Sequence, residues 1–144
     1  MRTVRDLLKT KGRHIWSVGP ADTVYAALVV MADKNVGALV VLEGGRLVGI
    51  LSERDYARKV VLHGKTSRET LVREIMTETP ICVGPGHTLE ECMTLMTDKR
   101  IRHLPVMEAD QLAGLVSIGD VVKDIISEQE FMIEQLEHYI TGTR

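Results

Sequence analysis

Apolar residues recur with helical spacing in two separate stretches of the chain. They occupy positions i, i+3, i+4 and i+7, as Val24, Ala27, Leu28 and Met31 in the first stretch and as Leu89, Cys92, Met93 and Met96 in the second. This spacing predicts two amphipathic helices, each with one apolar face. Asp22 and Thr88 precede these faces and are the predicted N-caps, and Thr88 with Glu91 matches a capping box.

Each predicted helix is followed by two short apolar runs that are rich in β-branched residues. These runs cover residues 36–42 and 47–51 in the first half, and residues 101–107 and 112–116 in the second. Their length and composition predict strands, and Gly44-Gly45 between the first two is typical of a tight hairpin. A further helix is expected to begin near Glu53 in one half and near Gly119 in the other, with Gly64 as the C-cap of the first.

The two halves are copies of one unit. Residues 18–23 align with residues 83–88 when the sequence is shifted by 65 positions, and the match continues without a gap to Ala57 and Val122. The unit reads β-α-β-β-α, and one copy is too small to cover both faces of its own sheet. We therefore predict an α+β (α/β) fold in which repeats 4–64 and 65–126 pack through their sheets about a pseudo-twofold axis, followed by a C-terminal helical extension over 127–144.

Composition places the chain among ordinary globular proteins. It is 44% hydrophobic and 26% charged, with a formal net charge of -2, so the general attraction to nucleic acid that a basic domain has is missing. No apolar stretch is long enough to span a membrane, and no signal-peptide pattern opens the chain, which predicts a cytoplasmic protein without a membrane partner. Cys82 and Cys92 are too few for a disulfide framework or a four-ligand zinc site, so no metal and no catalytic cofactor are expected.

The motif Ser-x-x-Asp occurs at equivalent positions of both copies, at residues 52–55 and 117–120. Each stands where the last predicted strand of a copy meets its last helix. One interpretation is structural, since an N-cap serine and an acid in the first turn stabilise a helix start. The other is a nucleotide site, because a helix N-terminus binds phosphate and a carboxylate accepts hydrogen bonds from ribose hydroxyls. Recurrence at the same register favours the nucleotide site.

Further segments complete a resemblance to a known family. They are Met76-Thr77, Pro80-Ile81-Cys82-Val83, Arg102-His103-Leu104-Pro105-Val106 and residues 114–120 in the second copy, and residues 35–41 and 49–55 in the first. Over residues 4 to 126 the chain resembles a tandem cystathionine-beta-synthase-type (CBS) domain pair, also called a Bateman module. The resemblance implies regulatory binding of an adenosyl compound (AMP, ADP, ATP, NAD or S-adenosylmethionine) rather than catalysis.

The resemblance also implies two ligand pockets, each built from both copies. One would contain Ser52, Arg54 and Asp55 with Thr77, Ile81, Arg102 and His103, and the other Ser117, Gly119 and Asp120 with Trp16, Val36, Gly37 and Ala38. Gly37 and Ala38 are small enough for a purine to approach the backbone. Trp16 and Ile81 offer surfaces on which a base can stack, although Trp16 is equally consistent with a core residue.

The two pockets are not expected to be equivalent. The segment from Lys9 to His14 is longer than its counterpart in the second copy and is predicted to be a basic loop, in which Lys11 is a candidate contact to phosphate. Ala38 also stands where the second copy has His103. We therefore expect the pockets to differ in ligand or in affinity.

The segment from Ile118 onward passes the end of the alignment at Val122, and the rest of it has no counterpart in the first copy. Val121, Ile125, Met132, Leu136 and Tyr139 approximate one apolar helical stripe, with Phe131 beside it. Such a stripe packs either on its own domain or on a partner helix, and we expect the second, in a homodimer.

The residues support three hypotheses about function. The preferred one is an adenosine-nucleotide sensor that acts in trans on an unidentified protein effector. The second is a small nucleotide-processing enzyme with His103 or Asp55 as general base, but no second carboxylate cluster or metal site accompanies them. The third is a nucleic-acid-binding module that uses the basic linker between the copies, against which the net charge argues. We therefore predict a binding protein that is not an enzyme.

Overall fold

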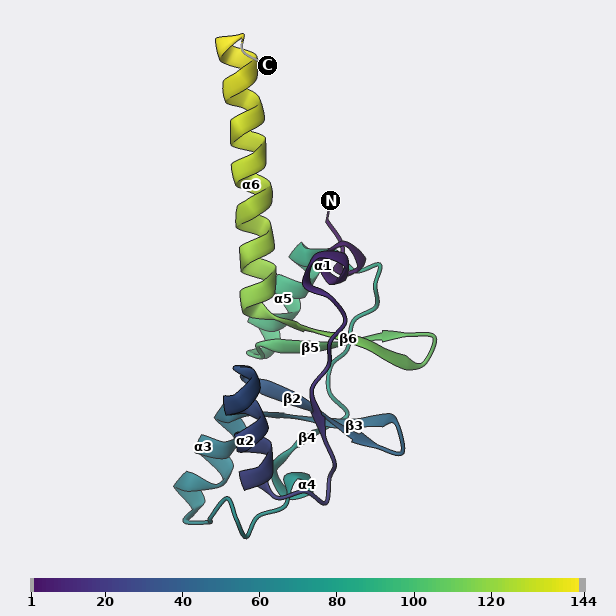
Figure 1. Ribbon diagram of the computed structural model, residues 1–144, viewed down its shortest axis with the longest axis vertical. Helices are drawn as coiled ribbons and strands as arrows, with labels where there is room; N and C mark the ends of the chain where they lie inside the picture. Colours follow the sequence, from purple (N-terminus) through teal and green to yellow (C-terminus); the bar gives the residue numbers. More distant parts are fainter. Residues whose placement is uncertain (1, 143–144) are drawn as a thin grey trace.

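Two β-hairpins lie one above the other at the centre of the molecule, in a computed structural model that describes residues 2–142 (Figure 1). The first joins β2 (Ala38–Glu43) to β3 (Arg46–Ser52), and the second joins β5 (His103–Glu108) to β6 (Gln111–Ser117). Both have the same register, with the first residue of one strand opposite the last residue of the other. β3 also contacts β6. The predicted strands, the first hairpin and the mixed α+β fold are confirmed.

The tight turns of both hairpins have left-handed backbone. Gly44 and Gly45 have φ of 59° and 80°, which glycine adopts without steric cost. Their counterparts Ala109 and Asp110 have φ of 51° and 62°. The second turn thus has the same backbone conformation although it contains no glycine. For this reason the sequence pattern predicted a tight turn only in the first hairpin.

The two sheets are unequal. In the first, the order is β1-β2-β3-β4, with β1 (Ser17–Val18) parallel to β2 and β4 (Thr77–Glu78) antiparallel to β3. Within the described residues, the second sheet consists of β5 and β6, and Val83 adds a parallel bridge to Val106. The strand expected to open each repeat is therefore two residues long in the first copy and a single bridge in the second.

The helices are α1 (Val4–Lys11), α2 (Val24–Lys34), α3 (Glu53–Lys59), α4 (Val72–Ile75), α5 (Leu89–Lys99) and α6 (Ile118–Thr141), with a 3₁₀ turn η1 (Val61–His63). Two predicted helix ends were wrong. The N-cap of α2 is Thr23, because the Asp22 carboxylate instead accepts a hydrogen bond from the backbone N–H of Gly19 at 2.8 Å. Gly64 ends the 3₁₀ turn, since α3 has already stopped at Lys59.

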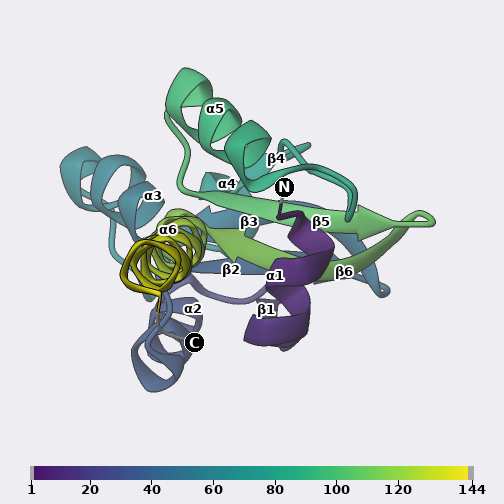
Figure 2. The same cartoon turned by 90° about the horizontal axis from the view of Figure 1, so that it is seen from above.

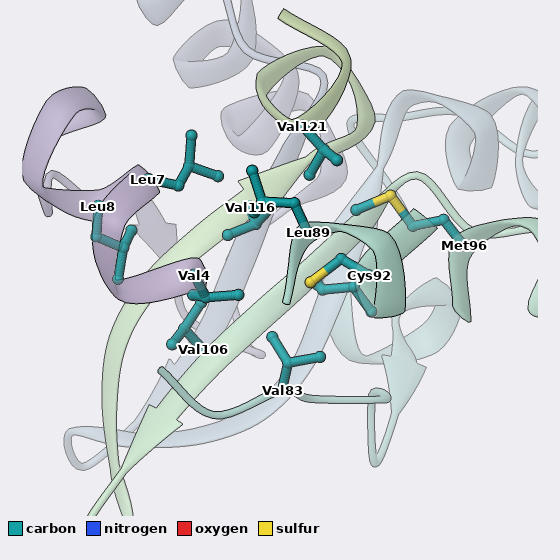
Figure 3. Close-up of a cluster of buried hydrophobic side chains, with 11 residues drawn as sticks. Val4, Leu7, Leu8, Val83, Leu89, Cys92, Met96, Val106, Val116 and Val121 are labelled. Atoms are coloured by element: carbon teal, nitrogen blue, oxygen red, sulfur yellow. The ribbon is translucent and has the colours of Figure 1, made fainter. Parts of the chain in front are cut away.

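The hydrophobic cores cross the predicted boundary between the repeats. Val4, Leu7 and Leu8 of α1 are buried in the core of the second repeat (Figure 3). Val72 and Ile75 of α4 are buried in the core of the first. Figure 1 accordingly shows α1 at the level of the second hairpin and α4 at the level of the first sheet. Each repeat contributes one helix to the hydrophobic core of the other. A division at residue 64 therefore follows the sequence repeat but does not separate the two cores.

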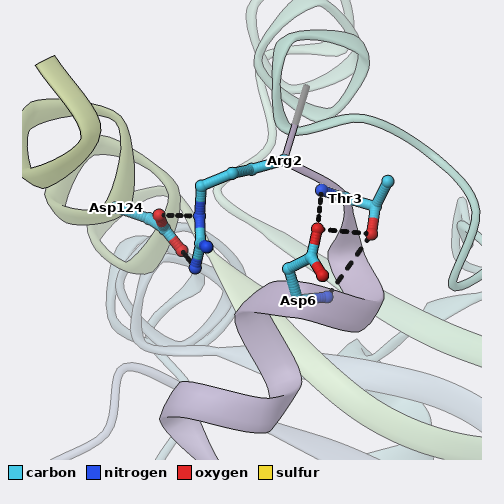
Figure 4. A network of polar contacts seen from close by, with 4 residues as sticks. All are labelled: Arg2, Thr3, Asp6 and Asp124. Carbon is cyan, nitrogen blue, oxygen red and sulfur yellow. Dashed lines mark hydrogen bonds and ion pairs between the residues drawn. The ribbon is translucent and has the colours of Figure 1, made fainter. Parts of the chain in front are cut away.

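Directed bonds also hold the start of α1 against the second repeat (Figure 4). The Arg2 guanidinium donates to the two carboxylate oxygens of Asp124 in α6, at 2.5 and 2.9 Å. Thr3 and Asp6 form a capping box at the first turn of α1. The predicted basic loop is correspondingly shorter than expected, because Lys9 to Lys11 form the last turn of this helix and Gly12, with φ of 92°, ends it. Lysines at a helix C-terminus interact favourably with its dipole.

α6 is one continuous helix that extends well beyond the two sheets (Figure 1), and Figure 2 shows it end-on. It includes the predicted extension as far as Thr141, and residues 143–144 of that extension lie outside the described residues. The apolar stripe expected on this helix differs in burial along its length: Val121 is buried in the second core and Ile125 packs against it, whereas Leu136 and Tyr139, farther along the helix, are exposed. No helix within residues 2–142 is both long and apolar enough to cross a membrane.

Candidate functional site

The first Ser-x-x-Asp motif starts α3 at the end of β3. The Asp55 carboxylate accepts hydrogen bonds from the backbone N–H of Ser52 at 2.8 Å and from its hydroxyl at 3.0 Å, while the Asp55 N–H donates to Ser52 Oγ at 3.2 Å. The capping interpretation is therefore confirmed. These bonds use Asp55 Oδ2, and the other oxygen, Oδ1, lies 3.3 Å from Lys59 Nζ. A ligand hydroxyl would compete with this lysine for Oδ1.

Beside this helix start lies a cavity of about 580 Å³ that both repeats build. Its lining includes all seven residues expected in the first pocket, namely Ser52, Arg54, Asp55, Thr77, Ile81, Arg102 and His103. The antiparallel pairing of β4 with β3 brings the segment after Thr77 beside the start of α3. A cavity of this size suits a small-molecule ligand.

Positive charge predominates in this cavity. Four arginines and two acids line it: Arg54, Arg58, Arg100, Arg102, Glu53 and Asp55. Guanidinium groups bind phosphate and carboxylate through paired N–H donors. The lining thus combines cations suited to a phosphorylated ligand with an acid suited to its hydroxyls.

Sequence reasoning missed two of these arginines. Arg58 follows Arg54 by one helical turn, so the i, i+4 spacing on α3 could have identified it. Arg100 ends α5 with a left-handed φ of 54°, the same value that its counterpart Asn35 has at the end of α2. Because an arginine gains less from this conformation than an asparagine does, local propensity did not mark the position.

His103 lies between the two predicted pockets. It lines the cavity and adjoins Gly37, where an added Cβ would be 3.8 Å from ring atoms Cε1 and Nε2. Burial lowers the pKa of His103, and the charges of Lys11 and Arg102 lower it further against the opposing effect of Asp120. The imidazole is therefore neutral near pH 7 and has one donor and one acceptor nitrogen.

The second Ser-x-x-Asp motif starts α6 in the same way, but its acid has a partner from α1. The Ser117 N–H donates to Asp120 Oδ2 at 2.9 Å, and the Asp120 N–H donates to Ser117 Oγ at 3.1 Å. The Lys11 ammonium donates to the same carboxylate and to the carbonyl of Leu115, both at 2.5 Å. Burial acts to raise the pKa of Asp120, but the bonds from Lys11 and Ser117 outweigh it and hold the pKa below its ordinary value.

The remaining residues expected in the second pocket are dispersed. Asp120 and Lys11 line a cleft of about 550 Å³ between α1 and α6. Val36 and Gly37 line a different cavity of about 260 Å³ beside α2, Gly37 also lines the cavity of Asp55, and Ala38 is buried in β2.

Two further residues of this second set, Trp16 and Gly119, lie on open surface. Trp16 is 37% exposed, and its ring stacks on His14 at a centroid distance of 5.7 Å with Lys34 Nζ 4.5 Å from its centroid. Gly119 is in the first turn of α6, where an added Cβ would meet Ser117 Oγ at 3.7 Å. The structure thus gathers the first predicted set into one cavity and distributes the second over several surfaces.

Comparison with known proteins agrees with the repeat and the fold. A family model described as CBS domain matches residues 3–62 and 72–127. The mitochondrial CBS domain-containing protein CBSX3 of Arabidopsis thaliana is 43% identical, over 97% of this chain and 72% of its own length. A CBS-domain protein from Burkholderia ambifaria is 49% identical with a TM-score of 0.85, over 88% of this chain and 96% of that one.

A more distant structure shares the fold alone. The CBS domain pair of MJ0100, solved with 5′-methylthioadenosine and S-adenosyl-L-methionine, has a TM-score of 0.79 at 21% identity and covers 89% of this chain and 98% of its own. The two segments that the family model matches correspond to the two copies seen in the sequence and to the two stacked hairpins with their helices. The chain therefore belongs to the CBS domain family and carries two copies of the domain.

Proposed function

We propose that this chain is a regulatory module that binds an adenosine nucleotide of the AMP, ADP, ATP or NAD type in the cavity of Asp55 and acts in trans on a protein effector. The observation that carries the proposal is the convergence of seven residues from both repeats on one cavity. A ligand that bridges two repeats stabilises one packing of the pair over others, which is the physical requirement for a signal.

We propose a role for each region of the cavity in binding one part of the nucleotide. Asp55 Oδ1, which is outside the helix cap, accepts from the ribose hydroxyls in place of Lys59. Arg54 and Arg102 bind phosphate, with Arg100 available for further phosphate groups. The half-exposed Ile81 offers an apolar surface to the base. The adenosyl ligands in the MJ0100 structure are in keeping with this ligand class.

The Asp120 site is proposed to bind more weakly or a different ligand. Its carboxylate is held by Lys11, whose nitrogen also bonds the carbonyl of Leu115. The ion pair of Asp120 with Lys11 is shorter than that of Asp55 with Lys59, 2.5 against 3.3 Å, so we expect a ribose hydroxyl to compete less well for Asp120. The cavity of Asp55 is therefore the site expected to fill first.

Calorimetric titration of the purified protein with AMP, ADP, ATP, NAD and S-adenosylmethionine tests this proposal. We expect at least one ligand to bind and, at about 100 times its Kd, to stabilise the fold by about 2.7 kcal/mol. Asp55→Asn should abolish binding at the first site and Asp120→Asn should leave it intact. The control is Asp110→Asn, a change at the hairpin tip where left-handed backbone suits asparagine.

Two outcomes would contradict the proposal. If none of the five compounds binds, the nucleotide-sensor function is wrong. If Asp55→Asn binds as tightly as the parent, the cavity of Asp55 is not the site. Chromatography of the nucleotides after incubation separates binding from turnover, and product formation would favour the enzyme hypothesis.

The proposal keeps a homodimer as the working assembly and a cytoplasmic location. The dimer is supported by the exposed apolar residues of α6, among them Ile133, Leu136 and Ile140. Because a relative is mitochondrial, microscopy of the tagged chain is the measurement that tests the cytoplasmic location.

A further inference from the structure

We propose that α6 pairs with α6 of a second copy of this chain, as an antiparallel two-stranded coiled coil. This goes beyond the proposed homodimer, because it names the seam, the orientation and the residue pairs. It does not depend on nucleotide binding.

The seam is a heptad pattern that the apolar-stripe analysis did not detect. Alternating steps of four and three residues connect Val122, Ile126, Gln129, Ile133, Leu136 and Ile140. This period of 3.5 residues is the one that two supercoiled helices share, whereas a helix that packs on a globular core follows 3.6. The three seam positions that are seven residues apart, 126, 133 and 140, are all isoleucine. One of the six seam residues, Gln129, is polar. Such a pattern, maintained over about 28 Å of helix, is typical of a helix that packs on a partner helix.

The seam is exposed along its whole length. Its five apolar side chains are between 38% and 80% exposed. The residues of α6 that pack on the second core, Val121 and Ile125, lie on an adjacent face, and those that line the cleft against α1, such as Asp124 and Phe131, lie on the opposite one. Neither the core nor α1 covers the seam, and Figure 1 shows that the helix projects beyond both.

Charge complementarity selects a second copy in antiparallel orientation. In an antiparallel pair centred between Gln129 and Ile133, one flank of the seam places Lys123 opposite Glu137 of the second copy, twice by symmetry. Between these two ion pairs Glu130 lies opposite Glu130 of the second copy, so two attractive contacts act against one repulsive contact. On the other side of the seam, Met132 lies opposite Met132 of the second copy. A parallel pair would place Glu137 against Met132 of the second copy and would leave Lys123 without an opposite charge.

The same arrangement pairs the seam residues in complete layers. Ile126 packs on Leu136 of the second copy, Ile140 on Val122, and Ile133 on Gln129, each layer occurring twice. Every seam residue has a partner, so the full exposed length is used. The two globular bodies then lie at opposite ends of the helical pair, where they do not compete for space.

Sedimentation equilibrium of the full chain tests the seam. We expect a dimer that Ile133→Glu weakens by more than about 30-fold, because a charge is placed at the centre of an apolar interface. Phe131→Glu is the matched control, since Phe131 is similarly exposed (60% against 56%) but lies on the opposite face, and it should leave the dimer unchanged. Gln129→Leu should tighten association. A monomeric parent, or a dimer that Ile133→Glu leaves intact, would overturn the proposal.

Disulfide trapping tests the orientation. Single variants Ile126→Cys and Leu136→Cys are prepared in a background with Cys82→Ser and Cys92→Ala and equilibrated in a glutathione buffer. The antiparallel pairing predicts a disulfide-linked dimer when the two variants are mixed, because residues 126 and 136 of different copies adjoin. Crosslinking of each variant to itself, without the mixed species, would show a parallel pair and overturn the orientation.

Discussion

The ammonium nitrogen of Lys11 lies 2.5 Å from Asp120 Oδ2, and the same nitrogen lies 2.5 Å from the carbonyl oxygen of Leu115. The first repeat has a related arrangement, in which Lys59 Nζ is 3.3 Å from Asp55 Oδ1 and 2.9 Å from the carbonyl of Ile75. Lys59 comes from the same helix as its acid, whereas Lys11 comes from the opposite end of the chain. The two equivalent acids are thus held by lysines of different origin.

Replacement of this lysine should release Asp120. In Lys11→Met the pKa of Asp120 should rise, because the hydrogen bond and the charge that lower it are lost. The free energy of unfolding should fall by about 1 kcal/mol, since both partners are only partly buried. An NMR titration of the carboxyl carbon and urea unfolding measure the two effects. Lys9→Met, on the exposed side of the same helix, is the control, and equal effects from both variants would contradict the assignment.

Stability should decrease in mild acid because of His103. Its pKa is lowered in the folded protein, chiefly by burial. As the pH falls through about 6.5, the unfolded chain takes up a proton that the folded chain does not, so the free energy of unfolding falls until the folded pKa is reached. Urea unfolding from pH 7.5 to 5 should show this slope, and His103→Gln should make it shallower. An unchanged slope in the variant would show that other histidines cause it.

The equivalent glycines Gly49 and Gly114 should differ in their tolerance of alanine. A Cβ at Gly49 would lie 2.7 Å from Met76 Sδ and 2.9 Å from the carbonyl of Thr77, which is backbone of β4. A Cβ at Gly114 would meet only the end of the Leu8 side chain, at 2.8 Å. Because the side chain can rotate and the paired strand cannot, we expect losses of about 3 kcal/mol for Gly49→Ala and about 1 kcal/mol for Gly114→Ala.

Chemical unfolding of the two alanine variants measures this difference. Gly86→Ala is the control, since no atom lies within 4 Å of its added Cβ, and it should be neutral or slightly stabilising. A Gly114→Ala variant less stable than Gly49→Ala would show that the core around Leu8 is the more rigid of the two.

The exchange of helices between the repeats predicts that a change in α1 weakens the second sheet. Leu8→Ala removes a side chain that is 2% exposed in the core of the second repeat and should cost about 3 kcal/mol. Hydrogen exchange should accelerate in β5 and β6 more than in β2 and β3. Ile75→Ala in α4 should give the opposite pattern, and faster exchange in β2 after the Leu8 change would contradict the crossed cores.

Local signals in the sequence were sufficient for much of the fold and for one pocket. Helical spacing located α2 and α5, the glycine pair located the first hairpin, and the serine motifs located the starts of α3 and α6. These features depend on neighbours within a few residues, so the chain itself carries the information. The residues of the Asp55 cavity that come from the second repeat could be predicted only because the family resemblance implied them.

The tertiary structure decided what depends on residues that are distant in the chain. It placed Lys11 in an ion pair with Asp120 and brought Arg58 and Arg100 into the cavity of Asp55. It also buried α1 in the core of the second repeat and α4 in the core of the first. It also separated the buried face of α6 from the exposed seam. The sequence by itself determined the duplicated unit, its strands and helices, and the two candidate acids, because these are local patterns repeated at a constant offset. Which lysine holds Asp120 was decided only when packing brought α1 onto the second repeat, because an ion pair between residues 11 and 120 has no local signature.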